Sequence, residues 1–173
     1  MRAGMNDTMM LEILERVRNR FYGKYRGTVT EVDATKMRIK AKVPSVLGLQ
    51  PTGWCMACVP YAGASVGIAF LPEVGSGVWI EFESGDVSYP IWSGCYWLRD
   101  EYPEDATETI KVIITQSGHK ILLDDEASTI TITDSNENKI TLESSGITLE
   151  RGSKKINITT SEVNVNDGAL EVI

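Results

Sequence analysis

The last third of the chain is a run of short alternating segments, Ile121–Ile173: ILLDDEASTITITDSNENKITLESSGITLERGSKKINITTSEVNVNDGALEVI. Pairs of aliphatic residues, with one residue between the two members, recur along this run, and successive pairs start seven to ten residues apart. Gly, Asn, Asp, Ser and Thr, which favour turns, lie between the pairs. The pattern predicts very short strands joined by tight turns, an internal repeat of irregular period.

The two faces of these predicted strands differ, because strand side chains alternate between faces. One face carries the aliphatic pairs, and the other carries Thr, Glu, Asp, Lys and Asn. No amphipathic helix within the segment could cover the apolar face. We therefore expect three identical chains to wind around a common axis, with strand edges pairing with neighbouring chains and the aliphatic residues inside. The predicted trimer core is Ile121, Leu123, Ile130, Ile132, Ile140, Leu142, Ile147, Leu149, Ile156, Ile158, Val163 and Val165.

A single-chain β-solenoid is the alternative for this segment, but its coils usually need about 20 residues or more. Seven to ten residues supply one side of a triangular layer, and three copies complete it. A trimeric prism that ends on Leu170, Val172 and Ile173 has an apolar tip, and exposed apolar patches normally mark binding sites. We expect a separate cap protein to bind these three residues; the alternative is that Ile173 folds back.

The middle of the chain, from about Tyr22 to Leu98, is also built of short strands, punctuated by turns at 75–77 and 84–86. Five or six strands within so short a segment predict a small Greek-key barrel of the OB type. The expected strands are Gly23–Val32, Thr35–Val43, Gly53–Pro60, Val66–Pro72, Gly77–Glu83 and Tyr89–Trp97, with a loop at Pro44–Gly53.

The N-terminal segment predicts one helix from Asn6 to about Arg20, capped by Asn6 or Asp7. One face of this helix is apolar and consists of Met10, Leu14, Val17 and Phe21. A helix of this length is marginal alone, so it must dock on the rest of the chain or on a partner.

The sequence as a whole predicts a mainly β protein with four parts. These are an N-terminal helix (residues 1–21), an OB-fold barrel (22–98), a linker (99–116) and an intertwined trimeric β-helix (117–173). No apolar run approaches the roughly 20 residues of a membrane-spanning helix, and the N-terminus does not resemble a signal peptide.

The formal charge is −7 and is unevenly distributed, because residues 99–173 contain 15 acidic and 7 basic residues. An acidic segment repels nucleic acid and anionic membranes, so we expect no nucleic-acid partner. The alternative is a nucleic-acid- or glycan-binding OB module with an oligomerising β tail. Its candidate surface is Tyr25 with the cations Lys36, Arg38, Lys40 and Lys42.

The residues that could support chemistry are few. Cys55 and Cys58 form a CxxC that could be half of a metal or redox site, but small buried strand residues are the favoured interpretation; Cys95 is the third cysteine. His119 is the sole histidine, without a nucleophile partner, and the acidic cluster 124–126 is typical of a solvated turn. We expect no enzymatic activity, no cofactor and no metal.

Two stretches of the middle segment carry a family resemblance: GWCMACVPYAG (53–63) and GIAFLPEVGSGVWIEFESGDVSYPIWSGCYW (67–97). They resemble the OB-fold region of phage baseplate assembly protein V and of VgrG spike proteins. SGHKILLDD (117–125) is similar to the start of the family's β-helix. The motif residues are Pro72, Val74, Gly75, Gly77, Val78, Ile80, Phe82, Gly85, Asp86, Pro90, Ile91 and Gly94.

The resemblance implies the homotrimeric central spike of a contractile injection machine: a phage tail, a phage-tail-like bacteriocin (tailocin) or a related particle. The barrels would lie under a tail hub, and the β-helix would be driven through the target cell envelope when the sheath contracts. A PAAR-repeat protein caps the tip in relatives. The particle would be assembled in the bacterial cytoplasm and released or ejected.

The sequence also departs from parts of the family. VgrG proteins carry a hub domain before the OB fold, whereas about 20 residues precede it here, so a separate hub protein is implied. Residues 99–116 are too short for the lysozyme domain of some phage spikes. Some spikes bind iron with histidines at the tip, and none lies near Ile173, so we expect no tip metal.

Overall fold

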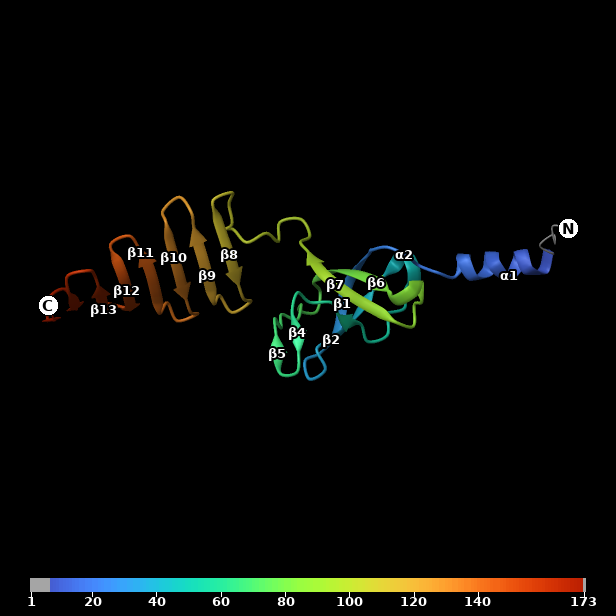
Figure 1. The fold of residues 1–173 in the computed structure, drawn as a ribbon, viewed down its shortest axis with the longest axis horizontal. Helices are drawn as coiled ribbons and strands as arrows, with labels where there is room; N and C mark the ends of the chain where they lie inside the picture. Colours follow the sequence, from blue (N-terminus) through green and yellow to red (C-terminus); the bar gives the residue numbers. More distant parts are fainter. Residues whose placement is uncertain (1–6, 173) are drawn as a thin grey trace. The chain divides into compact units, whose positions relative to one another are not determined.

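The computed structural model describes residues 7–172 of the chain. It divides into two compact units, Met1–Asp100 and Glu101–Ile173, each of which is described by itself. Strands dominate both units, and the only helix of more than one turn among the described residues is at the N-terminal end (Figure 1). The sequence expectation of a mainly β protein with a short N-terminal helix is confirmed.

The first unit contains a helix, a small curled sheet and a two-stranded hairpin. Its elements are α1 (Asp7–Arg18), β1 (Tyr25–Asp33), β2 (Arg38–Lys42), α2 (Pro44–Leu47), β3 (Met56–Ala57), β4 (Ala62–Gly63), β5 (Val66–Gly67), β6 (Gly77–Phe82), a 3-10 turn (Glu83–Gly85) and β7 (Pro90–Tyr96).

The sheet of this unit has the strand order β2-β1-β6-β7-β3, with β4 and β5 paired separately. Its pairs are antiparallel, apart from the parallel pair of β3 and β7. An isolated bridge between Ile39 and Cys55 links β2 to the segment that enters β3, so the sheet curls back on itself. The enclosed core is that of an OB-type barrel and contains Val29, Ile39, Ala41, Val43, Cys55, Val78, Ile80, Phe82 and Trp92.

The barrel differs from the sequence expectation in its shorter elements. Strand β3 has two residues where a strand over Gly53–Pro60 was expected. The expected loop at Pro44–Gly53 contains α2, which Pro44 starts because its fixed φ suits a first helical residue. Both differences arise where a short apolar stretch is punctuated by Gly or Pro, which shortens regular elements.

Helix α1 forms near the predicted range, although Asn6 lies outside the described residues. Its large apolar side chains, from Met9 to Val17, are between 42% and 66% exposed. Phe21, by contrast, packs against the barrel core, and its backbone N–H donates to the carbonyl of Gly85. No helix among the described residues is long and apolar enough to cross a membrane.

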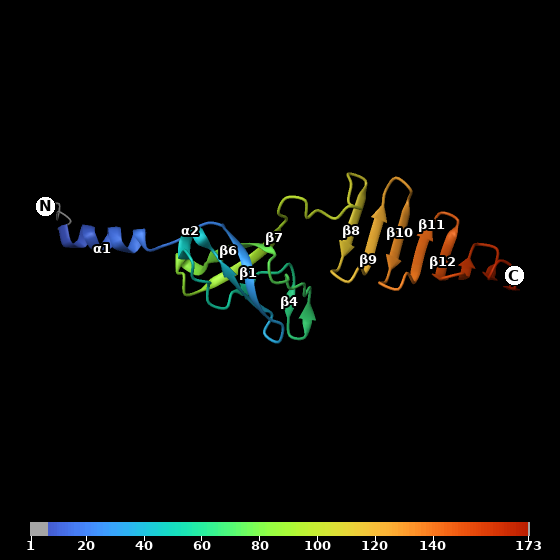
Figure 2. The same cartoon turned by 180° about the vertical axis from the view of Figure 1, so that it is seen from behind.

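The second unit is one sheet of eight strands. They are β8 (Ile110–Ile114), β9 (Lys120–Asp124), β10 (Thr129–Thr133), β11 (Lys139–Glu143), β12 (Gly146–Arg151), β13 (Lys154–Ile158), β14 (Val163–Val165) and β15 (Leu170–Val172). Each strand pairs antiparallel with the next one along the chain, so the spatial order follows the sequence (Figure 2).

The strand pairing of this unit differs from two sequence hypotheses. We expected the strand edges to pair with neighbouring chains, but successive strands pair within the chain because tight turns reverse it after each strand. The single-chain solenoid is wrong for the same reason, since a solenoid stacks parallel coils. Strand β8 lies inside the expected linker, residues 99–116, so that range is not without regular structure. The four part boundaries themselves stay a prediction.

Candidate functional site

Strand register arranges the aliphatic pairs of the second unit into two continuous rows across the sheet. Each residue of a row lies directly opposite its neighbour on the adjacent strand. Row A is Ile121, Ile132, Ile140, Leu149, Ile156, Val165 and Leu170. Row B is Leu123, Ile130, Leu142, Ile147, Ile158, Val163 and Val172.

This apolar face has no cover within the described chain. From Ile121 to Val163, the members of both rows are 36% to 42% exposed. Isolated exposed apolar residues are common on protein surfaces, but two adjacent rows that cross seven strands form a patch that marks an interaction site. All twelve residues of the predicted trimer core lie on this face; their burial in a trimer stays a prediction.

The opposite face is polar from β10 to β14. Its central row begins with Val112 and Leu122 at β8 and β9, and then passes from Thr131 through Thr141 and Thr148 to Asn157 and Asn164. Within it, the Thr148 hydroxyl lies 3.1 Å from the side-chain oxygen of Asn157 and donates to it. Cross-strand pairs of this kind stabilise a sheet without burial. From β10 to β14, only the face that bears rows A and B therefore requires a partner.

The apolar face has a defined limit at β8. Ile113 continues row A, but Lys111 occupies the next place in row B, opposite Leu123. The ammonium group of Lys111 donates to the backbone carbonyl of Glu108. Row B therefore ends in a cation at the first strand.

The predicted tip lies at the last strand. Leu170 is 60% exposed, and Val172 pairs in register with Val163. Ile173 lies outside the described residues. Binding of a cap protein by Leu170, Val172 and Ile173 therefore stays a prediction.

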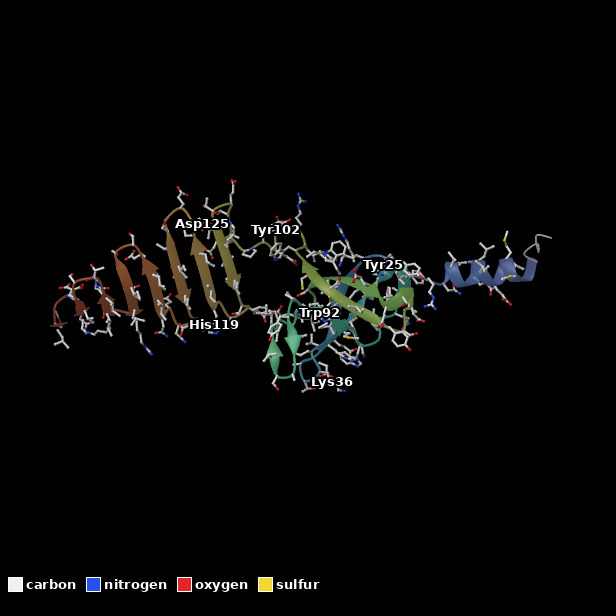
Figure 3. All side chains as sticks on the ribbon, viewed as in Figure 1. Tyr25, Lys36, Trp92, Tyr102, His119 and Asp125 are labelled. Carbon is white, nitrogen blue, oxygen red and sulfur yellow. The ribbon has the colours of Figure 1, made fainter. Side chains whose placement is uncertain are left out.

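The turns of the sheet hold its polar groups. Asp134 accepts hydrogen bonds from the side-chain amide and the backbone N–H of Asn138, and from the N–H of Asn136, which lower the pKa of Asp134 to about 2. His119 accepts a hydrogen bond from the N–H of Ser135 at its Nδ1. Figure 3 places His119 and Asp125 at opposite edges of the sheet. Both are turn residues, and no hydroxyl or thiol group contacts the imidazole of His119 in the described contacts.

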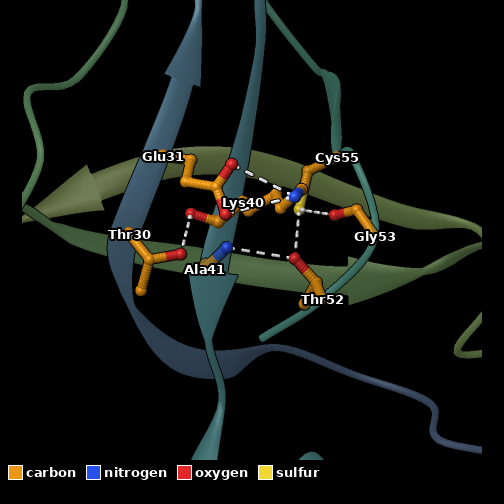
Figure 4. A network of polar contacts seen from close by, with 7 residues as sticks. All are labelled: Thr30, Glu31, Lys40, Ala41, Thr52, Gly53 and Cys55. Atoms are coloured by element: carbon orange, nitrogen blue, oxygen red, sulfur yellow. Dashed lines mark hydrogen bonds and ion pairs between the residues drawn. The ribbon is translucent and has the colours of Figure 1, made fainter. Parts of the chain in front are cut away.

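The CxxC residues have separate environments. Cys55 is buried in the barrel core, and its Sγ lies 3.2 Å from the hydroxyl of Thr52, which accepts a hydrogen bond from the N–H of Ala41 (Figure 4). Burial raises the pKa of the Cys55 thiol, so the thiol stays protonated at neutral pH. Cys58 is exposed. Within residues 7–172, no three His, Cys, Asp or Glu side chains gather as metal ligands.

Two residues of the candidate nucleic-acid surface, Tyr25 and Lys40, are engaged in internal contacts. The ring of Tyr25 packs against Phe82, and its hydroxyl donates to the carbonyl of Tyr22. The ammonium of Lys40 pairs with Glu31 and lies over the ring of Trp54. Tyr25 is thus a packing residue rather than an open stacking platform for bases.

The fold and its uncovered face define a class: a structural β protein in which an OB barrel is joined to a self-associating repeat sheet. Two family models match the chain. Residues 25–97 match the injector OB domain of type VI secretion systems and phage baseplates. Residues 111–171 match the C-terminal trimerisation domain of phage baseplate protein V.

The chain belongs to the phage baseplate assembly protein V and VgrG-like family. The family is a structural baseplate family, and it supports a baseplate spike role, a homotrimer and a location at a phage tail or baseplate. No curated protein matches the chain significantly.

The sequence predicted the apolar face but not the residue at which row B ends. It identified which residues share the face, because alternation has a period of two. It did not predict that Lys111 ends row B, since β8 was assigned to the linker. The segment IKVII (110–114) does indicate a strand, because Ile110, Val112 and Ile114 are apolar residues at every second position.

Proposed function

We propose that the protein is the central spike of a contractile injection system, in which three copies of the C-terminal sheet form the shaft. The observation that supports this most directly is the pair of uncovered aliphatic rows, whose burial contributes roughly 1.5–3 kcal/mol per large side chain. With one sheet on each side of a triangular prism, rows A and B of all three copies face the axis. The Thr and Asn rows then face water.

The proposed shaft suits a mechanical task. Every strand lies across the long direction of the sheet, and each strand from β9 to β14 is hydrogen-bonded to the strand before it and the strand after it. Bending such a prism would separate many strand pairs and expose its dry core at once, so axial force passes along it with little distortion. We propose that sheath contraction drives this shaft through the target cell envelope, and that the protein contributes no catalysis.

The partners that we propose follow from the two ends of the chain and from the family. The exposed apolar side chains of α1 give the barrel end a surface for a separate hub protein. The apolar C-terminal strand suits a PAAR-like cap protein. The particle, a phage tail or a tailocin, would be assembled in the bacterial cytoplasm and released or ejected.

The test of the proposal is the solution mass of the full chain, measured by light scattering during size-exclusion chromatography. We expect three times the chain mass of 19.1 kDa. Ile140→Asn in row A should weaken or abolish the trimer, because it buries an amide without a partner at three equivalent places. Thr141→Asn, on the next residue of the same strand but on the opposite face, is the matched control. A monomeric wild-type chain overturns the proposal.

A further inference from the structure

The turns of the C-terminal sheet alternate between its two long edges, because each strand reverses direction. One edge holds the turns after β9, β11 and β13, at residues 124–129, 143–146 and 159–162. The other edge holds the turns after β8, β10, β12 and β14, at residues 115–119, 134–138, 151–154 and 166–169. We call the first the acidic edge and the second the basic edge.

Between residues 112 and 173, Lys and Arg are confined to one of these edges, although that edge also carries the carboxylates of Asp134, Glu137, Glu150 and Asp167. The turns of the acidic edge contain no Lys or Arg, and their charged residues are Asp124, Asp125, Glu126, Glu143 and Glu162. None of these five forms an ion pair among the described residues. Every Lys and Arg between residues 112 and 173 lies at the basic edge, and these are Lys120, Lys139, Arg151, Lys154 and Lys155.

Three of the basic residues are already paired within the chain. The ammonium groups of Lys120, Lys139 and Lys155 reach carboxylates, for Lys155 that of Asp167 at 2.6 Å. Arg151 and Lys154 are exposed, and neither forms an ion pair with any residue that the structure describes. They lie directly opposite each other across the β12–β13 pair.

These two cations lie on the apolar side of the sheet. By strand alternation, Arg151 follows Leu149 and Lys154 precedes Ile156 on the face that bears rows A and B. A groove of about 450 Å³ opens at this place, lined by row A residues from Ile140 to Val165, by Arg151 and Lys154, and by the ion-paired Lys139, Glu150 and Lys155. An apolar groove bordered by two unpaired cations is complementary to a segment that carries aliphatic and acidic side chains. The acidic edge of another copy, where Leu142 and Ile147 flank Glu143 and Gly146, has this composition.

We propose that the trimer is closed head to tail, with the basic edge of each copy seated on the acidic edge of the next. Arg151 and Lys154 then pair with Glu143 and Glu162 of the neighbouring copy. This inference rests on the proposed function, since it requires the trimer. A contact between two different edges is heterologous, and three such contacts form a ring when the rotation is threefold.

The positions of the turns along the threefold axis support this pairing. A threefold rotation brings equivalent residues of all copies to one level along the axis. Arg151 and Lys154 flank the β12–β13 turn, while Glu143 and Glu162 lie in the turns one strand before and one strand after it. Strands are spaced about 4.8 Å apart, so Arg and Lys side chains span the offset. Edge pairs at the border of a dry core fix register and handedness more than they add raw affinity.

The experiment exchanges charges in the full chain. Arg151→Glu with Lys154→Glu places carboxylates against the neighbouring Glu143 and Glu162, and should lower the melting midpoint of the trimer by about 5–10 °C. Glu143→Lys with Glu162→Lys should have a similar effect. The variant that combines all four substitutions should recover most of the loss in melting midpoint. In 1 M NaCl, the difference in melting midpoint between the double variants and wild type should become smaller. The matched control is Lys42→Glu with Arg99→Glu, which makes the same charge change at exposed residues of the barrel unit that form no ion pair among the described residues.

Each outcome bears on one of the two proposals. A monomeric wild-type chain overturns the spike and the trimer together. A wild-type trimer whose Arg151→Glu/Lys154→Glu variant melts with the barrel control overturns the edge pairing alone. A fourfold variant no more stable than either double variant also overturns the pairing, because the exchanged charges then do not meet. Recovery in the fourfold variant supports the pairing.

Discussion

At the scale of single residues, Gly146 holds the turn between β11 and β12 in a conformation that a side chain cannot enter. Its φ is 150°, and a Cβ placed there would lie 2.1 Å from the carbonyl oxygen of Ile158. That oxygen belongs to β13, the strand that pairs with β12, so the backbone of Gly146 lies directly against the neighbouring strand. Glycine is used here because the backbone of one strand passes directly against another.

Gly146→Ala should therefore destabilise the protein by about 3 kcal/mol or more, because β12 and β13 must separate locally. Gly152→Ala is the control: its φ of 57° is also left-handed, but nothing lies within 4 Å of the added methyl group. It should cost only about 1–2 kcal/mol. Urea denaturation of both variants measures the difference, and equal losses would contradict the steric explanation.

Asp134 makes the stability of the sheet depend on pH under acidic conditions. Hydrogen bonds from the Asn138 side chain, and then from backbone N–H groups, lower the pKa of Asp134 from 3.8 to about 2. The stabilisation from a lowered pKa is present above 3.8 and is lost as the pH falls towards 2. Asp134→Asn should thus lower the melting midpoint at pH 6 and flatten its decline between about pH 4 and pH 2. Glu137→Gln in the same turn is the control, and an unchanged pH profile in Asp134→Asn would argue against this role.

At the scale of elements, the sequence predicts what depends on local pattern and misses what depends on tertiary contact. The seven aliphatic pairs each became a strand, from β9 to β15, because alternation and turn residues act within a few residues. Helix α2 was missed, since the apolar stretch after Pro44 is too short for periodicity to identify it. The parallel pairing of β3 with β7 was not predicted either, because β7 lies more than 30 residues further along the chain.

The candidate site was predictable in composition but not in arrangement. Alternation alone assigns Ile140 and Leu142 to one face. The two straight rows depend on register, which turn length sets strand by strand. The contrast between the acidic and basic edges needs the full strand order, because the edge of a turn depends on how many strands precede it. The sequence analysis placed β8 in the linker. Without β8 the same turns still share an edge, but the position of Lys111 in row B cannot be recognised.

Helix α1 is an element whose apolar face has no part in the barrel core. The residues that pack on that core from the N-terminal side begin at Phe21. A chain that lacks residues 1–18 should therefore remain a trimer and keep the melting midpoint of the full-length protein to within about 2 °C, since exposed side chains contribute little to folding. If α1 is the surface for the hub protein that we propose, the same truncation should abolish binding to that protein in a pull-down assay. A truncated chain that no longer forms trimers would instead place α1 in the trimer contact.

At the scale of the whole molecule, the two units obtain their stability from different sources. The barrel encloses its own core, in which Ile39, Val43, Val78 and Ile80 are fully buried. The C-terminal sheet leaves its aliphatic rows exposed within one chain, so its stability must depend on association and hence on protein concentration. We therefore expect the C-terminal sheet, rather than the barrel, to hold the three chains together.

Fragments that correspond to the two units test this division. Residues 19–100 should fold as a monomer with a melting midpoint that does not change with concentration. Residues 101–173 should form trimers, and their midpoint should rise with concentration because unfolding separates three chains. Light scattering and thermal melting at concentrations a hundredfold apart measure both. A monomeric, folded 101–173 fragment would mean that one sheet is stable with its apolar face in water, and a trimeric 19–100 fragment would transfer the assembly contact to the barrel.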